Sequence, residues 1–348
     1  MESVIRDAIV NHLETNKLIA DTQHGFRNGR SCLTNLLSYL ELITKNIDEG
    51  NIVDAVYLDF AKAFDKVPHQ RLLLKLKNHG ISGNILQWIS SWLYNRRQCV
   101  QLKGSKSEWL WVSSGVPQGS VLGPVLFLIF INDFGKDING TVLKFADDSK
   151  LFGKANSVAD CKRIQDDLDK LKQWSDIWQM QFNVDKCKAI HFGAHNTKFT
   201  YNIDGIPLEN TETERDLGII VSDTLKSTDQ CAAAYNKANR ILGLIKRTVV
   251  SRDPSILVAL YKSLVRPHLE FCCSAWSPHY KKDRTLIERI QHRFTRLFKD
   301  LQKLDYSERL NHLGLWTLEE RRNRADLIEV FKLCKGQRTN SCACNQLL

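Results

Sequence analysis

Two short stretches decide how this 348-residue chain folds: YLDFAKAFD at residues 57–65 and FADDSKLF at residues 145–152. The β-branched and aromatic residues before Asp59 predict a strand over 52–60 that ends near this acid. In the second stretch, the runs VLKFA and SKLF flank Asp147 and Asp148, which predicts a hairpin with both acids at its tip. If these strands share one sheet, we expect the three carboxylates to lie close together.

Carboxylates gathered in this way repel one another unless a cation holds them. Hard oxygen ligands favour Mg²⁺ or Mn²⁺. Two such ions about 4 Å apart stabilise both the attacking and the leaving oxygen of a phosphoryl transfer. An isolated Asp-Asp pair is more often a turn or a cap, so the prediction of a metal site depends on the two stretches together.

Further motifs surround this pair. The segment SGVPQGSVLGPVLF (114–127) is a glycine-containing loop that opens into an apolar helix, where the backbone can approach a phosphate or a base pair closely. Upstream lies QHGFRNGRSC (23–32), and downstream lies FNVDKCKAI (182–190). Trp109 and Trp111 alternate just before the loop and are compatible with a two-faced strand beside it, whereas tryptophans elsewhere have the helical spacing of core residues.

Taken in order, these five segments resemble the motif series of reverse transcriptases, and their wording is closest to the non-LTR retrotransposon (LINE) branch. LGIIVSD (217–223) is similar to the primer grip, and 234–278 is similar to the helical thumb of CR1 and Jockey-like elements. The resemblance implies an RNA-directed DNA polymerase that adds deoxynucleoside triphosphates to a DNA primer on an RNA template. It also implies an α+β right-hand fold: partial fingers (1–55), a palm of antiparallel sheet with packed helices (56–225, with the reverse transcriptase domain at about 1–222), and a helical thumb with a C-terminal extension (226–348).

The resemblance assigns catalytic and metal-binding roles. It implies two Mg²⁺ ions, or Mn²⁺, held by Asp59, the carbonyl of Phe60, Asp147 and Asp148. Lys186 matches the lysine proposed to protonate the pyrophosphate leaving group, although a surface lysine is the alternative. Cys187 follows it where the family usually has Thr or Ser.

The resemblance also implies a nucleotide pocket. Phe64 would lie under the incoming sugar and exclude a 2′-hydroxyl, although a core aromatic is the alternative. Gln118 would face the nascent base pair or the template, and Gly119 beside it would belong to the same nucleotide-binding pocket. Arg27 or Arg30 would grip the triphosphate through a planar guanidinium. Asp65 either supports the site or caps the helix before Lys66.

The excess positive charge lies in the last third of the chain. From residue 231 onward there are 22 Lys and Arg against 11 Asp and Glu, a local net charge of +11 in a chain whose total is +10. Such asymmetry favours a polyanionic partner. We expect Lys237, Arg240, Lys246 and Arg247 to bind the phosphates of the primer–template duplex.

Other features limit the setting. No apolar run approaches the ~18 residues that span a bilayer, so we expect no membrane association. Ten scattered cysteines without paired zinc spacing favour reduced thiols in an intracellular compartment, and the resemblance adds the nucleus. His191 and His195 are four apart, but their strand-like, glycine-broken surroundings disfavour a metal role. The oligomeric state is open.

Three functions remain: a reverse transcriptase, a nucleic-acid-binding remnant that has lost the chemistry, and an RNA-templated RNA polymerase. Phe64 argues against the third. The motif series begins close to Met1 without the finger strand that normally precedes it, which suggests an N-terminally truncated copy. We therefore expect correctly placed catalytic residues in a chain with weak or no activity.

Overall fold

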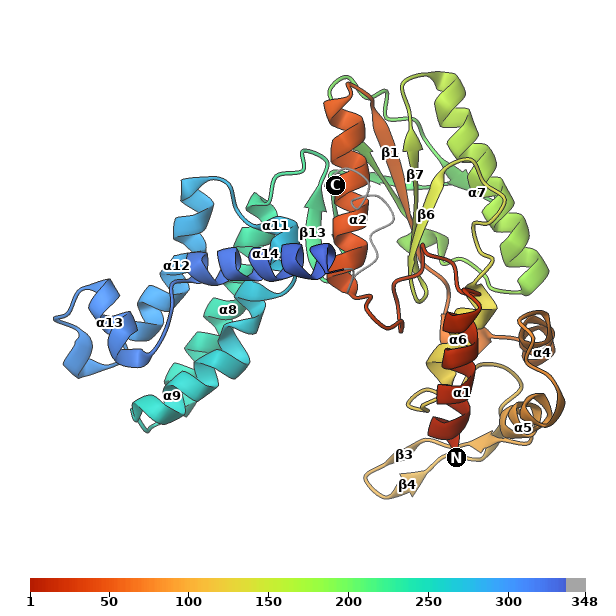
Figure 1. Cartoon of the computed structure of the whole chain (residues 1–348), viewed down its shortest axis with the longest axis horizontal. Helices are drawn as coiled ribbons and strands as arrows, with labels where there is room; N and C mark the ends of the chain where they lie inside the picture. The colour runs from red at the N-terminus through yellow and green to blue at the C-terminus, as the bar shows by residue number, and fades with distance from the viewer. Residues whose placement is uncertain (336–348) are drawn as a thin grey trace. The chain divides into compact units, whose positions relative to one another are not determined.

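The strand expected before Asp59 forms as β1 (Val53–Leu58) and lies at the centre of a five-stranded sheet (Figure 1). The structure is a computed structural model that describes residues 1–335. The last 13 residues of the expected thumb, 336–348, lie outside the described part. Nearly every residue of β1 is buried, because this strand has a neighbour on either side and packed side chains above and below.

The sheet has the order β11–β8–β1–β7–β6. Its pairs are antiparallel except for the parallel pair β11–β8. The strands beside β1 are as follows: β6 (Thr141–Phe145), β7 (Asp148–Lys154), β8 (Lys188–Phe192) and β11 (Glu209–Thr211). Strand and helix segments alternate irregularly along the chain, so the predicted α+β class is confirmed.

Helices and two small hairpins complete the first of two compact units, which comprises Met1–Asn35 and Glu41–Thr211. Its α-helices are α1 (Glu2–Thr15), α2 (Cys32–Asp48), α3 (Ala63–Lys66), α4 (His69–Asn78), α5 (Gly83–Leu93), α6 (Gly123–Ile131) and α7 (Val158–Trp178). Helix α2 begins at a capping box between Ser31 and Thr34, and α7 begins at one between Ser157 and Asp160. After β8, the short strands β9 (Asn202–Ile203) and β10 (Ile206–Pro207) pair with each other.

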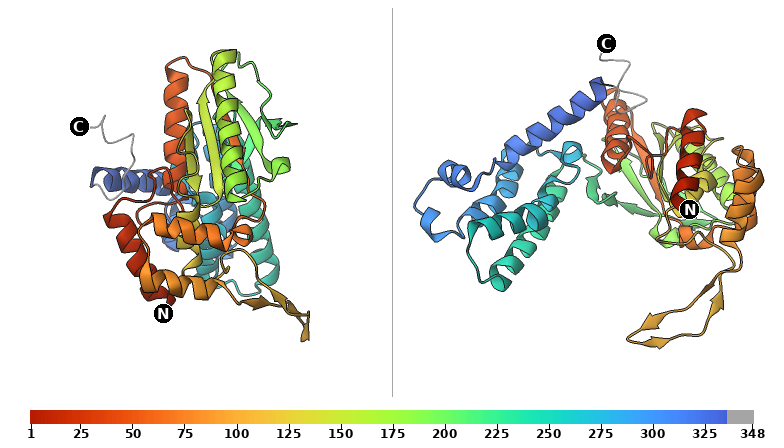
Figure 2. Two further views of the ribbon diagram at one scale, coloured as in Figure 1. Left: turned by 90° about the vertical axis from the view of Figure 1, so that its right-hand side faces the viewer. Right: turned by 60° about the horizontal axis from the view of Figure 1, so that its bottom comes forward.

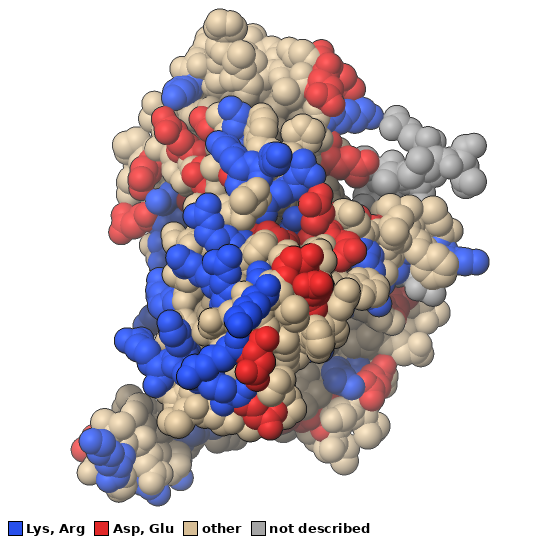
Figure 3. Space-filling view, turned by 90° about the vertical axis from the view of Figure 1, so that its left-hand side faces the viewer, with Lys and Arg blue, Asp and Glu red and all other residues tan. Residues whose placement is uncertain are grey.

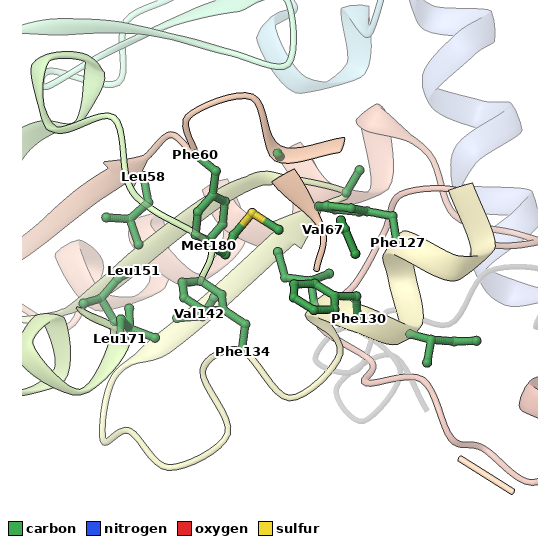
Figure 4. Packing of buried hydrophobic residues seen from close by; sticks show 14 of the residues in the cluster. Leu58, Phe60, Val67, Phe127, Phe130, Phe134, Val142, Leu151, Leu171 and Met180 are labelled. Atoms are coloured by element: carbon green, nitrogen blue, oxygen red, sulfur yellow. The ribbon is translucent and has the colours of Figure 1, made fainter. Parts of the chain in front are cut away.

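The core of this unit lies between the sheet and the apolar helix α6, which is buried over its whole length. Phe60 stacks on Phe182 at 4.8 Å between ring centroids and meets the edge of Phe134 at 5.4 Å. Figure 4 shows Phe60, Met180 and Phe134 in this cluster with Phe130 and Val142. The aromatic residue directly after Asp59 is thus anchored in the core.

A buried carboxylate joins the first residues of β1 to β8. Asp54 accepts hydrogen bonds from His191 Nδ1 at 2.8 Å and from the hydroxyl of Tyr201 at 2.7 Å. Hydrogen bonding to Asp54, against the effect of burial, raises the pKa of His191. His191 is therefore a structural partner of Asp54, at the end of β1 away from Asp59.

The second unit begins at Glu212 and also takes in Leu36–Leu40. Its hairpin β12 (Thr213–Asp216) and β13 (Ile219–Ser222) leads into helices, shown in Figure 2: α8 (Thr228–Thr248), α9 (Pro254–Leu260), α10 (Pro267–Glu270), α11 (Cys273–Trp276), α12 (Lys281–Thr295), α13 (Tyr306–Leu313) and α14 (Leu318–Cys334). Pro254 and Pro267 each begin a helix, where the missing amide costs nothing. Within residues 1–335 we find no helix long and apolar enough to cross a membrane.

Candidate active site

The pairing of β1 with β7 determines where the acidic residues meet. Leu58 lies opposite Ser149, so the chain leaves β1 at Asp59 directly beside the β6–β7 turn that carries Asp147. The ammonium of Lys186 lies 3.5 Å from Asp59 Oδ2. Three sequence-predicted site residues, 59, 147 and 186, are thus brought to one end of the sheet.

The tip of the hairpin differs by one residue from the prediction. Ala146 and Asp147 form the turn, and Asp148 is already the first residue of β7, paired with Phe145. Ala146 has a φ of 56°, the left-handed conformation that a tight reversal requires. Because neighbouring side chains of an extended chain point to opposite faces, Asp147 is half-buried whereas Asp148 is exposed.

Residues 23–25 hold this turn in place. The amide oxygen of Gln23 accepts hydrogen bonds from the backbone N–H of Ala146 at 2.9 Å and of Gly25 at 2.7 Å. A Cβ on Gly25 would lie 2.4 Å from the backbone nitrogen of Ala146, so only glycine fits. The glycine of the QHG motif is therefore required by close backbone approach to the β6–β7 turn.

The described residues do not fully balance the negative charges of Asp59 and Asp147. Asp59 Oδ2 is buried and accepts no hydrogen bond from the described residues, although Lys186 lies near it. Burial raises the pKa of Asp147; its own backbone amide opposes this rise, and the charge of Asp59 adds to it. A cation between these side chains would relieve both effects. Within residues 1–335, however, no group of three or more His, Cys, Asp or Glu gathers as a ready metal site.

Cys187 packs against the backbone of Asp59. The backbone N–H of Asp59 donates to Cys187 Sγ at 3.4 Å, and the thiol lies 3.4 Å from the carbonyl of Asn183. Burial raises the pKa of this thiol to about 11, so it stays protonated. Cys187, which stands where the family usually has Thr or Ser, thus helps to hold the backbone of Asp59 in place.

Phe64 lies on a rigid support. Its ring stacks on Phe127 of α6 at 4.3 Å, and Phe26 meets it edge-on at 6.4 Å. Its carbonyl accepts a hydrogen bond from Val116 at 2.8 Å. The ring is only partly buried, so it is packed from below and still presents a surface.

The loop 114–119 is tied to the segment after β1. Gly115, with a φ of 92°, lies so close to Asp65 that a Cβ would be 2.6 Å from its carbonyl oxygen. Gln118 donates its amide to Asp65 Oδ1 at 2.8 Å, and Gly119 is exposed beside it. The alternative that Asp65 caps a helix is wrong, because it lies inside α3 and the N-cap is Lys62.

Neither candidate triphosphate arginine extends into solvent. Arg27 donates to the carbonyl of Ala20 at 2.9 Å and is 19% exposed, whereas Arg30 is 4% exposed and lies 3.5 Å from Asp21. Burial and the charge of Arg27 lower the pKa of Arg30, which Asp21 partly offsets. Arg27 is the more accessible of the two.

In the second unit, the predicted cations Lys237, Arg240, Lys246 and Arg247 are all exposed on α8. The sequence reasoning missed a second basic surface, a hollow of about 710 Å³ on α12 that five Lys or Arg and one His line: Lys281, Arg284, Arg289, Arg293, Arg296 and His292. The signal was the spacing of 289, 293 and 296, which places three arginines on one helical face. Lysine and arginine side chains gather densely on the face of the molecule in Figure 3.

A family model described as reverse transcriptase (RNA-dependent DNA polymerase) matches residues 2–230. The RNA-directed DNA polymerase from the mobile element jockey of Drosophila funebris is 26% identical over 303 residues, which cover 82% of this chain and 33% of that protein. The probable RNA-directed DNA polymerase from transposon BS of Drosophila melanogaster is 25% identical over 93% of this chain and 37% of that protein. The chain therefore spans about a third of the length of these relatives.

Two solved telomerase structures resemble this chain in fold. Telomerase from Candida albicans, in complex with a fragment of telomeric RNA, superposes with a TM-score of 0.53 at 10% identity over 87% of this chain and 56% of that chain. Apo telomerase from Candida tropicalis gives a TM-score of 0.51 at 12% identity over 86% of this chain and 50% of that chain. These likenesses concern the fold alone, and they confirm the expected right-hand polymerase architecture.

His24 generates a pH-dependent prediction. The hydroxyl of Thr34 donates to the carbonyl of Ser31 at 2.8 Å, so His24 Nδ1 donates to Thr34, also at 2.8 Å, and Nε2 faces Arg30. Burial, with the nearby charges of Arg30, Lys150 and Arg27, lowers the pKa of His24 to about 3. Below pH 6.5 the unfolded chain therefore binds a proton that the folded chain refuses, and stability is lost as the pH falls.

We expect His24→Asn, whose amide can keep the bond to Thr34, to remove this slope. The difference in unfolding free energy between the two proteins should change by on the order of 1 kcal/mol per pH unit between about pH 6 and pH 4. Urea denaturation at each pH measures it. Parallel stability curves for the two proteins would contradict the assignment of a buried, neutral His24.

Proposed function

The chain belongs to the reverse transcriptase (RNA-dependent DNA polymerase) family, and we propose that it extends a DNA primer on an RNA template with deoxynucleoside triphosphates. The observation that carries the proposal is the meeting of Asp59, Asp147 and Lys186 at one end of the sheet. The chain covers only about a third of the length of its relatives. The activity is therefore proposed for this chain and is not carried over from the whole proteins. Its division into fingers, palm and thumb is part of the same proposal.

Reverse transcriptases use divalent metal ions, and we assign two Mg²⁺, replaceable by Mn²⁺, to this site. Asp59 and Asp147 would hold them, with further oxygens from Asp148 and the carbonyl of Phe60. The orphaned Asp59 Oδ2 and the raised pKa of Asp147 support this assignment. Mg²⁺ commonly takes only one or two protein carboxylates and completes its shell with water and substrate phosphates, which accords with Asp59 and Asp147 as the principal ligands. Bound there, the ions supply charge stabilisation at the attacking and leaving oxygens.

Other side chains of the site would position the substrates. Lys186, with 67% of its side chain exposed, can reach a departing pyrophosphate and give it a proton from Nζ. The ring of Phe64, fixed by its stack on Phe127, would fill the space of a ribose 2′-hydroxyl. Gln118 and Gly119 would contact the nascent base pair, and Arg27, the more accessible arginine, would move from its carbonyl partner to the triphosphate.

The helices of the second unit would hold the primer–template duplex. The exposed cations of α8 and the arginines of α12 supply the positive charge for this contact. The two glutamates of the α12 hollow are already engaged, Glu319 with Arg284 at 2.7 Å and Glu288 with the backbone of Leu318 at 3.0 Å. Net positive charge therefore remains for phosphates, and affinity for the duplex should fall steeply as salt rises.

Primer extension tests the function. The purified chain is incubated with poly(rA)–oligo(dT), dTTP and Mg²⁺, beside Asp147→Asn and the exposed control Asp137→Asn. We expect weak Mg²⁺-dependent incorporation, which Asp147→Asn lowers by at least about 100-fold because the metal contributes several kcal/mol of transition-state stabilisation. Asp137→Asn should leave it unchanged.

Binding of the same hybrid, measured in low salt, separates the alternatives. A chain that binds the hybrid but incorporates nothing under any metal would refute the proposed chemistry and favour a nucleic-acid-binding remnant. If Asp147→Asn lost hybrid binding together with activity, Asp147 would be a structural residue.

Sugar selection tests the role of Phe64. In Phe64→Ala the space for a 2′-hydroxyl opens, so the preference for dTTP over UTP, measured as the ratio of kcat/KM values, should fall by at least about 10-fold, or 1.4 kcal/mol. Phe64→Tyr keeps the ring and should keep most of the preference. Because each ratio compares two substrates on one enzyme, partial misfolding cancels. Equal loss of activity toward both substrates would instead make Phe64 a core residue.

A further inference from the structure

Residues 96–112 form an arm that the proposed reaction does not yet use. Two short ladders build it: β2 (Arg97–Gln98) pairs with β5 (Leu110–Trp111), and β3 (Gln101–Leu102) pairs with β4 (Ser105–Lys106). Figures 1 and 2 show the arm projecting from the rest of its unit. Large apolar side chains on it face solvent, including Trp109 at 57% and Trp111 at 67% exposure. A surface of this kind is unusual on a protein without a partner.

The two tryptophans enclose a cation. Arg97 lies opposite Trp111 in the ladder, and its guanidinium is 5.2 Å from the ring centre of Trp111 and 5.9 Å from that of Trp109. Because the same guanidinium lies near both ring centres, the two rings and the cation form one aromatic and cationic surface. Leu110, which is 64% exposed, lies on the opposite face.

This surface continues into a cavity beside the loop 114–119. The cavity has a volume of about 670 Å³, and its lining includes Trp111, the loop residues and three cations: Lys62, Arg96 and Arg97. The one carboxylate in the lining, Asp65, is engaged by Gln118. A phosphate group in the cavity would therefore meet positive charge.

The charge of the arm selects among occupants. Residues 96–112 contain four Lys or Arg and one acid, Glu108. An apolar protein surface would strip water from these cations without pairing them, which is costly. Single-stranded nucleic acid satisfies both features at once, because its bases stack on aromatic rings while its phosphates pair with the cations.

We propose that the arm binds the unpaired template strand ahead of the position being copied. Bases of this strand stack on Trp109 and Trp111, and its phosphates contact Arg96, Arg97 and Lys62 on the way to the loop 114–119. This inference rests on the proposed function for its identification of the strand as template. Its test does not require catalysis.

Fluorescence anisotropy of the full chain tests the proposal. Three labelled RNA–DNA hybrids are compared: a blunt hybrid, one with a 5′ RNA template overhang, and one whose overhang lacks bases. We expect the natural overhang to tighten binding. Trp109→Ala and Trp111→Ala should each remove at least about 5-fold of this gain. Trp111→Phe should retain most of the gain, and Leu110→Ala, the matched change on the opposite face, should retain it fully.

Three results would overturn the proposal: equal affinity for blunt and overhanging hybrids, equal affinity for natural and base-free overhangs, or a loss in Leu110→Ala as large as in the tryptophan variants. An arm that instead served contacts between proteins would give the first result, because an overhang would gain nothing from it. A chain that incorporates no dTTP but shows the tryptophan-dependent gain retains the proposal and loses only the polymerase function. A chain that extends primers without the gain loses only the proposal.

Discussion

The antiparallel pairing of β1 with β7 is the constraint on which the rest of the structure depends. Side chains of a strand alternate between faces, so a slip of one residue would turn every side chain of β1 over and carry Asp59 away from the turn. The register is held by burial on both sides of the sheet and by the Asp54–His191–Tyr201 contacts at the far end of β1. The pairing of β1 with β7 therefore determines both the packing of the hydrophobic core and the meeting of Asp59 with the β6–β7 turn.

Contacts from distant segments hold the end of the sheet that carries Asp59 and Asp147. Gln23 and Gly25 hold the turn, Cys187 packs on the backbone of Asp59, and Phe127 supports Phe64. Each contact joins segments more than 50 residues apart in the sequence. The motifs are thus not only sets of functional side chains. They also contain the glycines and amides by which the segments fit one another, as Gly25 and Gly115 demonstrate.

The sequence predicted the strand before Asp59, the hairpin around 147 and the helix after the glycine loop, because each follows from local periodicity and turn chemistry. Resemblance to the family added the roles that we propose for Phe64 and Lys186. What local reasoning missed depends on long-range contacts. Gln23 accepts a hydrogen bond from Ala146 across 123 residues, and Gln118 donates one to Asp65 across 53 residues; local periodicity reveals neither contact. Sequence also could not predict that Arg27 and Arg30 are largely buried. Nor could it predict that Arg97 lies beside both tryptophans of the arm, since both features depend on the folded chain.

The central claim is that Asp59 and Asp147 form a carboxylate pair completed by a divalent cation. Electron paramagnetic resonance of Mn²⁺ with the full chain, without nucleotide or nucleic acid, measures this most directly. The account predicts that Asp59→Asn and Asp147→Asn each weaken Mn²⁺ binding by at least about 10-fold, since each removes a charged ligand from a site of few protein ligands, while Asp137→Asn leaves binding unchanged. Mn²⁺ binding that survives intact in both site variants would contradict it.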